Sequence, residues 1–191
     1  NKKIEMKFHA IPDAVQDISN GKMIIVVDNE DRENEGDLVM ASELITPDAV
    51  NFMAREARGL ICVSISEKRA KGLYLEQMNR RNTSLHETAF TVSVDAKNNT
   101  TTGISAFDRA ETIRVLISEN SSPDDLAKPG HIFPIVGKEG GVLRRAGHTE
   151  ASMDLSVLAG LKASGVICEI MSKDGSMARL AQLKKVAKKF N

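Results

Sequence analysis

The sequence contains no tryptophan and one tyrosine, and aromatic residues make up only 4% of its 191 residues. Aliphatic side chains and eight methionines must therefore fill the core. Lysine plus arginine equals aspartate plus glutamate at 26 each, so the bulk charge indicates neither a nucleic-acid nor a membrane partner. The sequence also lacks an apolar run of membrane-spanning length and a recognisable signal peptide.

Cysteine is scarce as well. The two cysteines, Cys62 and Cys168, lie far apart and form no C-x-x-C pattern. Each falls in an apolar run, which favours buried thiols over metal ligands. Lone thiols are typical of a reducing compartment, so the cytoplasm is the expected location. A chain of this length suits one domain, which we expect to cover residues 1–191.

Apolar runs and helix signals alternate along the chain. The expected strands are 23–27, 38–45, 60–65, 90–94 and 166–170. The expected helices are 14–19, 46–57, 105–117, 149–160 and the Lys-rich end 183–190. Two of these helices have N-cap signals at Thr46 and Ser105, and Gly59 is expected to end the helix that begins at Thr46. The alternation predicts an α+β or α/β domain.

An acidic segment, 28–37, lies between the first two expected strands and reads D-N-E-D-R-E-N-E-G-D. Its six carboxylates are those of Asp28, Glu30, Asp31, Glu33, Glu35 and Asp37. Their mutual repulsion costs stability, and a bound cation would offset that cost. The segment is therefore a candidate divalent-metal loop with oxygen ligands. An EF-hand alignment starting at Asp31 puts Ser42 where a glutamate is required, which excludes that kind of calcium site.

A second segment, 140–150, reads G-G-V-L-R-R-A-G-H-T-E. Arg144 and Arg145 offer guanidinium groups suited to phosphate, and Thr149 lies at an expected helix start where free N–H groups bind anions. His148 is a candidate metal ligand or acid–base group. An ordinary glycine-rich turn before a capped helix explains the same letters, so the segment alone leaves both interpretations open.

Two further residues have two interpretations each. His131 lies between prolines in P-G-H-I-F-P, where a structural histidine is the simpler explanation. Glu169 lies in an apolar strand and is either an outward-facing residue or a catalytic base. Common nucleotide-binding and zinc-hydrolase motifs are absent from the sequence.

Together, these segments resemble 3,4-dihydroxy-2-butanone 4-phosphate synthase. The resemblance covers almost the whole chain and rests on VVDNEDRENEGDLVMASELIT, TTGISAFDR, KPGHIFP, GGVLRRAGHTEASMDLSVLAG and GVICEI. It implies a single domain with a central mixed sheet flanked by helices. It also implies a lyase of riboflavin biosynthesis that converts D-ribulose 5-phosphate to L-3,4-dihydroxy-2-butanone 4-phosphate and formate. The steps are a metal-stabilised enediolate, dehydration, skeletal rearrangement and loss of C4.

The resemblance also assigns residues. It implies two Mg²⁺ or Mn²⁺ ions per active site, with Glu33 and His148 as protein ligands, and a homodimer with shared active sites. The implied catalytic residues are Asp37, Glu169 and His131. The implied substrate contacts are Arg32, Glu33, Asp37, Thr88, Arg145, Ala146, Gly147, His148, Thr149 and Glu169. Asp37 and Glu169 both remain candidates for the base that removes the C3 proton, and we favour Asp37 because its loop is linked to the metal.

Two other functions remain as alternatives. One is a non-catalytic metal-binding or regulatory relative of the same fold. The other is an acidic hairpin module for a basic partner, which gives no reason for the glycine, arginine and histidine of the 140–150 segment. The sequence leaves open whether a GTP cyclohydrolase II domain follows this chain, as it does in some members of the family.

Overall fold

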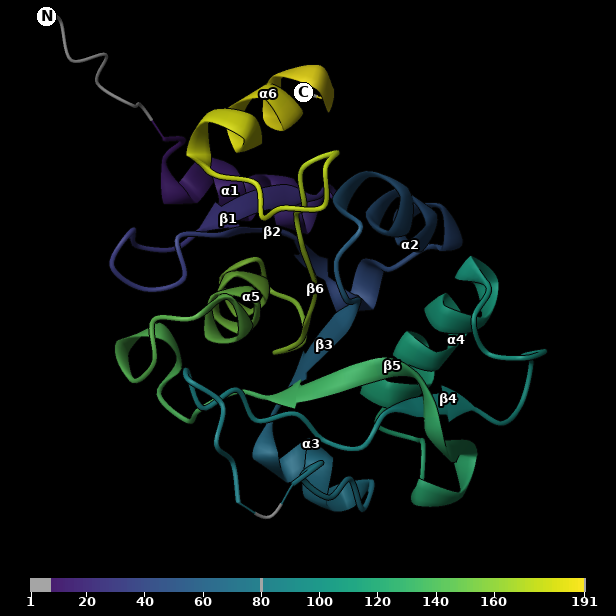
Figure 1. Cartoon of the computed structure of the whole chain (residues 1–191). Coiled ribbons are helices and arrows are strands. Elements are labelled where there is room, and N and C mark those ends of the chain that lie inside the picture. The colour runs from purple at the N-terminus through teal and green to yellow at the C-terminus, as the bar shows by residue number, and fades with distance from the viewer. Residues whose placement is uncertain (1–7, 80, 191) are drawn as a thin grey trace, which may run out of the picture.

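A six-stranded mixed sheet organises the chain in the order β1-β2-β6-β3-β5-β4 (Figure 1). The computed structural model describes residues 8–79 and 81–190. The strands are β1 (Ile24–Val27), β2 (Gly36–Ala41), β3 (Cys62–Ile65), β4 (Val94–Ala96), β5 (Leu126–Val136) and β6 (Gly165–Glu169). Strands β3 and β5 pair in parallel, and the other neighbours pair antiparallel. The prediction of a central mixed sheet is confirmed.

Helices cover both faces of this sheet. They are α1 (Ile11–Ser19), α2 (Pro47–Phe52), α3 (Glu67–Gly72), α4 (Ala106–Ile117), α5 (His148–Leu158) and α6 (Leu180–Phe190). Helices α1 and α5 pack together on one face, whereas α2 and α4 pack together on the other. Short turns of 3₁₀ helix occupy Ser42–Leu44, Pro123–Asp125 and Gly141–Leu143, and a π-helical turn, Met53–Ala57, extends α2.

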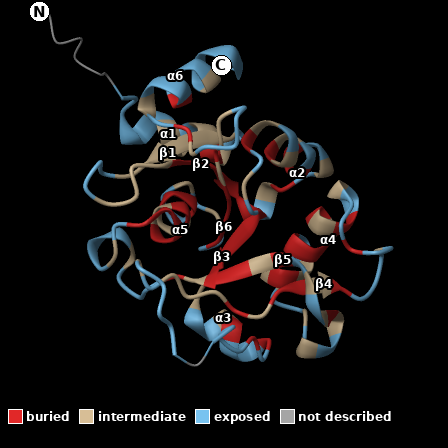
Figure 2. Ribbon diagram, in the orientation of Figure 1, coloured by how far each residue is buried: buried red, intermediate tan, exposed pale blue. Residues whose placement is uncertain are grey.

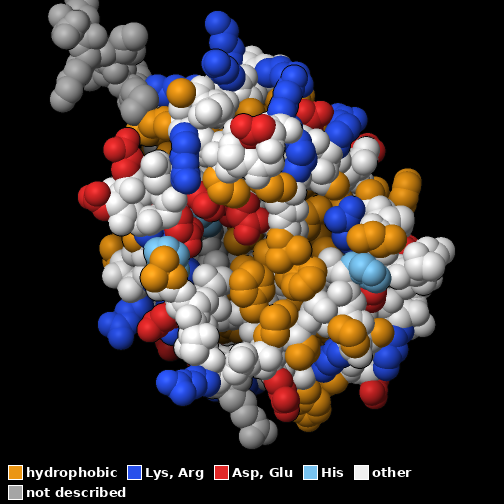
Figure 3. All heavy atoms as spheres, viewed as in Figure 1, with side chains coloured by type: hydrophobic (Ala, Val, Ile, Leu, Met, Phe, Trp, Pro, Cys, Tyr) orange, Lys and Arg blue, Asp and Glu red, His pale blue; other side chains and the backbone are white. Residues whose placement is uncertain are grey.

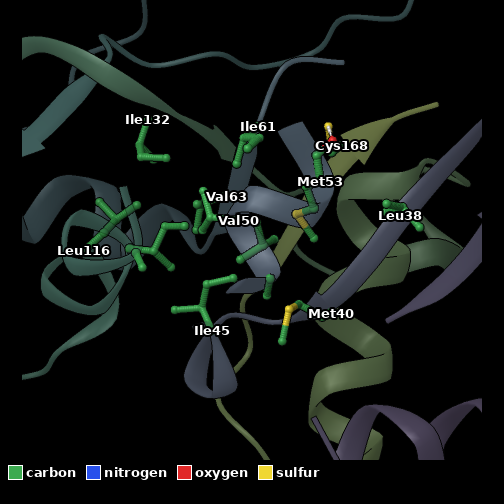
Figure 4. Close-up of a cluster of buried hydrophobic side chains, with 14 of the residues drawn as sticks. Leu38, Met40, Ile45, Val50, Met53, Ile61, Val63, Leu116, Ile132 and Cys168 are labelled. Carbon is green, nitrogen blue, oxygen red and sulfur yellow. Dashed lines mark hydrogen bonds between the residues drawn. The ribbon is translucent and has the colours of Figure 1, made fainter. Parts of the chain in front are cut away.

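Strand β2 is buried on both faces, which fixes the direction of every side chain along it. Leu38 and Met40 belong to the larger hydrophobic cluster, which also contains Val50 of α2, and all three are labelled in Figure 4. Val39 and Ala41 belong to the smaller cluster beneath α1. Strand alternation then places Asp37 on the α5 face of the sheet, together with Val39. The buried centre and exposed helix surfaces are shown in Figure 2.

The two predicted N-caps are confirmed, whereas α1 and α6 each begin three residues before the predicted starts at 14 and 183. The Thr46 hydroxyl accepts a hydrogen bond from the Ala49 amide at 3.1 Å, and the Ser105 hydroxyl accepts one from the Asp108 amide at 3.0 Å. Both are N-cap interactions, which satisfy amides that a helix leaves free. The predicted helix end at Ala57 is confirmed, but the residue that terminates the helix is Arg58, with a left-handed φ of 67°, and not Gly59.

Two strand predictions need correction, and one strand, β5, was not predicted. Residues 90–94 do not form one strand. The Thr91 amide donates to the carbonyl of Pro134 and the Val92 amide to that of Glu76, so neighbouring residues pair with two different segments. Residues 42–45 lie beyond the end of β2 and are largely a 3₁₀ turn. Strand β5 was missed because its prolines argue against a ladder position, yet it pairs with both β3 and β4.

The two cysteines are buried and free, as predicted. Burial raises the pKa of Cys168 to about 12, so it stays a thiol at neutral pH. Among the described helices, none has the length and apolar character that a membrane crossing requires.

Candidate metal and substrate site

The acidic segment forms the loop between β1 and β2, and its backbone is wrapped around the carboxylate of Asp28. The amides of Glu33 and Glu35 donate to this carboxylate at 3.1 and 2.9 Å, and the Arg32 guanidinium donates to it at 2.7 Å. Although burial raises the pKa of Asp28, the Glu35 amide and Arg32 outweigh that effect and hold it below its usual value. Asp28 therefore shapes the loop by accepting hydrogen bonds.

Glu33 is held beside His148, the first residue of α5. Its Oε2 atom lies 3.6 Å from His148 Nδ1 and accepts a 2.7 Å hydrogen bond from Arg32. The His148 ring and the Arg32 charge lower the pKa of Glu33 to about 2, against the effect of burial. Asp28, Glu33 and His148 each offer a ligand atom within 4.8 Å of the others. The two predicted metal ligands, distant in sequence, are therefore brought together.

Asp37, near the start of β2, lies close to the same nitrogen of His148. Its Oδ1 atom is 3.8 Å from His148 Nδ1, and its side chain is 5% exposed. Burial raises the pKa of Asp37 to about 7, and the nearby Glu169 charge adds to the shift. Asp37 Oδ1 and His148 Nε2 are both buried and have no hydrogen-bond partner among the described residues.

These atoms allow a test of whether the residues suit a divalent cation. A buried polar atom without a partner is costly, and a bound ion or substrate oxygen would supply the missing interaction. Carboxylate oxygens suit Mg²⁺ and Mn²⁺, and a neutral imidazole nitrogen is an accepted additional ligand. The donor set around His148 therefore fits a hard divalent cation.

Glu169 lies next to Asp37 across the sheet. The two residues are register partners in the antiparallel pair of β2 and β6. Glu169 Oε2 accepts a hydrogen bond from the Leu60 amide at 2.9 Å. A Cβ atom at Gly59 would overlap the Glu169 backbone, so only glycine permits this close approach. Both candidate bases therefore occupy one site.

The N-terminus of α5 forms a second part of the site. Gly147 is its N-cap and provides no side-chain cap, so the first amides of the helix lack a side-chain acceptor from that position. Arg145 Nη2 lies 3.2 Å from the Thr88 hydroxyl, and Arg145 Nη1 lies 2.7 Å from Glu150. A Cβ at Gly147 would crowd the guanidinium groups of Arg145 and Arg32. Thr88 and Arg145, two of the predicted substrate contacts, are thus brought together.

A cavity of about 470 Å³ opens beside these guanidinium groups. Its lining residues are mainly basic and are Arg32, Leu85, His86, Glu87, Lys138, Arg144 and Arg145. Positive side chains and a helix N-terminus together favour an anionic group such as phosphate. Figure 3 shows acidic side chains gathered beside a broad hydrophobic area of the surface.

His131 stands apart from this constellation. It lies on β5, which β3 separates from β6 in the sheet order. Its Nδ1 atom is 2.7 Å from Asp95 on β4, and its amide donates to the same carboxylate at 2.8 Å. Within the described part of the chain, no hydrogen bond or ion pair joins His131 to the other predicted site residues.

Sequence reasoning missed two carboxylates that hold site residues. Glu150 is only 1% exposed and anchors Arg145, and Asp95 holds His131. For Glu150 the sequence contained a signal. This acid follows R-A-G-H-T in the first turn of a predicted helix, where it can contact the arginine of that motif, Arg145. For Asp95 the pairing of β4 with β5 decided the contact, and the sequence did not predict either of these strands.

Comparison with known proteins shows the family of the chain. A family model described as 3,4-dihydroxy-2-butanone 4-phosphate synthase matches residues 12–191. The riboflavin biosynthesis protein RibBA of Cytophaga hutchinsonii is 57% identical over 98% of this chain and 46% of its own length. The chain thus spans about half the length of that curated relative.

Solved structures show the same fold. RibBX from A. baumannii, a two-domain 3,4-dihydroxy-2-butanone 4-phosphate synthase, superposes with a TM-score of 0.91 at 47% identity, covering 95% of this chain and 54% of that one. A 3,4-dihydroxy-2-butanone 4-phosphate synthase in complex with two magnesium ions gives a TM-score of 0.90 at 40% identity, covering 96% and 90%. The chain belongs to the 3,4-dihydroxy-2-butanone 4-phosphate synthase family.

Proposed function

We propose that this chain is a lyase of riboflavin biosynthesis that converts D-ribulose 5-phosphate to L-3,4-dihydroxy-2-butanone 4-phosphate and formate. The observation that carries the proposal is the meeting of Glu33, His148 and Asp37 within 3.8 Å of one imidazole nitrogen, with Glu169 next to Asp37 in the sheet. The five carbons of the sugar phosphate leave as a four-carbon phosphate and one formate. Water is lost in the dehydration and returned when C4 departs, so the atoms balance.

The phosphate group of the substrate fits the basic cavity. Arg145 lines this cavity and already bridges Thr88 and Glu150, and the uncapped amides at the start of α5 follow it closely in the sequence. A dianionic phosphate at that position places the sugar carbons toward the carboxylates on β2 and β6. Binding energy from the phosphate then orients the reacting carbons.

Glu33 and His148 would hold the divalent cations, which we propose to be two Mg²⁺ or Mn²⁺ ions. Asp28 is less suited as a direct ligand, because three donors already occupy its oxygens. When bound, a divalent cation supplies Lewis-acid stabilisation of negative charge that develops on the sugar oxygens. The relative solved with two magnesium ions supports this assignment.

Asp37 is the proposed base for the C3 proton. A base works best when its pKa lies near the operating pH, and burial raises the pKa of Asp37 to about 7. Glu169 has one oxygen engaged by the Leu60 amide, which restrains its carboxylate. We assign Glu169 to positioning the sugar and to later proton transfers.

We further propose that the active form is a homodimer with shared active sites, in the cytoplasm. His131 supports this arrangement, because its ring is 42% exposed and is held by Asp95 away from the other site residues of its own chain. The surface also exposes large hydrophobic side chains, including Leu60, Ile104 and Phe107. In a homodimer, the His131–Asp95 pair of one copy would complete the site of the other.

The direct test is to incubate the protein with D-ribulose 5-phosphate and Mg²⁺ and to measure formate, with and without EDTA. We expect formate only with the cation present. The Glu33→Ala variant should fold and give no formate, because it loses a partly exposed ligand and no core contact. Absence of formate from the wild-type chain, or formation that EDTA leaves unchanged, would contradict the proposal. Mn²⁺ binding without formate would favour the non-catalytic relative.

A further inference from the structure

We propose that Arg179 is a positioning residue, which fixes the backbone of the acidic loop and so aims the carboxylate of Glu33 at the metal site. Arg179 lies between β6 and α6, far from the loop in sequence. Its Nη1 atom donates to the carbonyl oxygen of Glu33 at 3.1 Å and also to that of Asn34. The inference rests on the proposed metal site, and extends it to a segment more than 140 residues away.

Arg179 adds donors from outside the loop to those that the loop supplies itself. The amides of Glu33 and Glu35 point inward, to Asp28. The carbonyls of Glu33 and Asn34 are instead bonded to Arg179. Asn34 has a φ of 53°, in the left-handed region that a residue with a side chain adopts at a cost. Asp28 and Arg179 therefore hold the same turn from opposite sides.

Helix α6 keeps Arg179 in place. Its Leu183 side chain is buried, and its amide donates to the Arg179 carbonyl at 3.0 Å. A Cβ at Gly36, directly after the loop, would overlap the Leu183 side chain, so helix and loop are in close contact. At the other end of the helix, Phe190 packs edge-on against Phe52 with ring centroids 4.9 Å apart. Figure 1 shows α6 packed beside the β1–β2 end of the sheet.

Removal of Arg179 can change metal affinity in two opposite directions, through its charge or through its contact with the loop. A guanidinium near the site repels a cation, so removal of its charge alone would strengthen binding. If Arg179 instead holds the loop in its binding geometry, its removal weakens binding. Partners that orient a metal ligand typically contribute tenfold or more to affinity. The sign of the change therefore separates the two effects.

The test is Mn²⁺ binding, followed by electron paramagnetic resonance on the wild-type chain and on Arg179→Ala. We expect Arg179→Ala to bind Mn²⁺ about tenfold more weakly. The matched control is Arg114→Ala, which removes the same charge and a contact to the Ile45 carbonyl, away from the loop. It should bind Mn²⁺ as the wild type does. Unchanged or tighter binding by Arg179→Ala would overturn the inference.

An uncharged variant provides the second test. Leu183→Ala leaves every charge in place but loosens the contact of α6 with Gly36, and circular dichroism checks that it folds. We expect weaker Mn²⁺ binding, and faster hydrogen exchange of amides 28–36 in both Arg179→Ala and Leu183→Ala. Unchanged exchange in Arg179→Ala would also overturn the inference.

The outcomes separate this inference from the proposed function. If the wild type binds Mn²⁺ but forms no formate, the proposed function fails, and weaker binding by Arg179→Ala still supports the role of Arg179. If the wild type forms formate and Arg179→Ala binds Mn²⁺ equally well, only the inference fails. If the wild type binds no Mn²⁺, both fail.

Discussion

Asp37 and Glu169 are direct cross-strand partners, at the start of β2 and the end of β6. Acidic residues directly opposite each other destabilise a sheet, so their pairing needs a compensating gain. The Nδ1 atom of His148 lies 3.8 Å from Asp37 Oδ1, and its attraction for the carboxylate offsets part of the repulsion. Burial, with the Glu169 charge, raises the pKa of Asp37 to about 7, which makes one member of the pair a poised proton acceptor.

Stability of the metal-free protein should depend on pH through Asp37. Its pKa rises from 3.8 in the unfolded chain to about 7 in the folded one, so between these values the folded protein holds a proton that the unfolded chain has lost. Stability therefore falls as the pH rises toward and through 7. Asp37→Asn removes this dependence and should gain up to about 4 kcal/mol over the wild type above that range. Urea denaturation in EDTA measures the difference, which should vanish below about pH 4.

The two candidate bases should differ in proton exchange at C3. If Asp37 is the base, Asp37→Asn abolishes exchange of the C3 proton of D-ribulose 5-phosphate with solvent deuterium. Glu169→Gln should retain exchange but form little formate, because the later steps lose their carboxylate. Nuclear magnetic resonance of the substrate in D₂O follows both. Exchange retained by Asp37→Asn and lost in Glu169→Gln would assign the base to Glu169.

Glu150→Gln should raise KM for the substrate more than it lowers kcat. The Glu150 carboxylate accepts from Arg145 and from the Lys138 amide at 2.9 Å, so it fixes the arginine proposed to bind phosphate. We expect KM to rise about tenfold with a smaller change in kcat, and stability to fall by about 2–3 kcal/mol, because a buried charged pair is broken. Steady-state kinetics and thermal unfolding measure both.

The control for Glu150→Gln is Glu67→Gln, which breaks an exposed pair with Lys71. It should leave KM and kcat unchanged and alter the free energy of unfolding by no more than about 0.5 kcal/mol. An unchanged KM in Glu150→Gln would show that Arg145 does not depend on Glu150.

Metal removal should lower the melting temperature of the wild-type protein and leave Glu33→Ala unaffected. A ligand that binds only the folded state stabilises it by about 2.7 kcal/mol at a hundredfold excess over Kd. Scanning calorimetry with Mg²⁺ and with EDTA gives the shift for both proteins. An equal shift in Glu33→Ala would place the cation at other ligands.

The local signals in the sequence were reliable where one segment decides the structure. Thr46 and Ser105 cap helices as predicted, and the acidic loop lies between two strands as predicted. Local signals failed at 90–94 and in β5, because the hydrogen-bond partners there come from distant segments. The positions of prolines and the alternation of apolar and polar residues describe one strand by itself. They contain no information about the strand with which it pairs.

For the site, motif resemblance named Glu33, Asp37, His148 and Glu169, and residue types alone indicated a candidate cation-binding loop. Only the tertiary structure decided that β2 pairs with β6 and that α5 starts beside the loop, which brings the four together. It also separated His131 from them and revealed Glu150, Asp95 and Arg179 as supports. The physical reason is that sequence fixes chemistry residue by residue, whereas distances between remote side chains follow from strand register and helix packing, which depend on the whole chain.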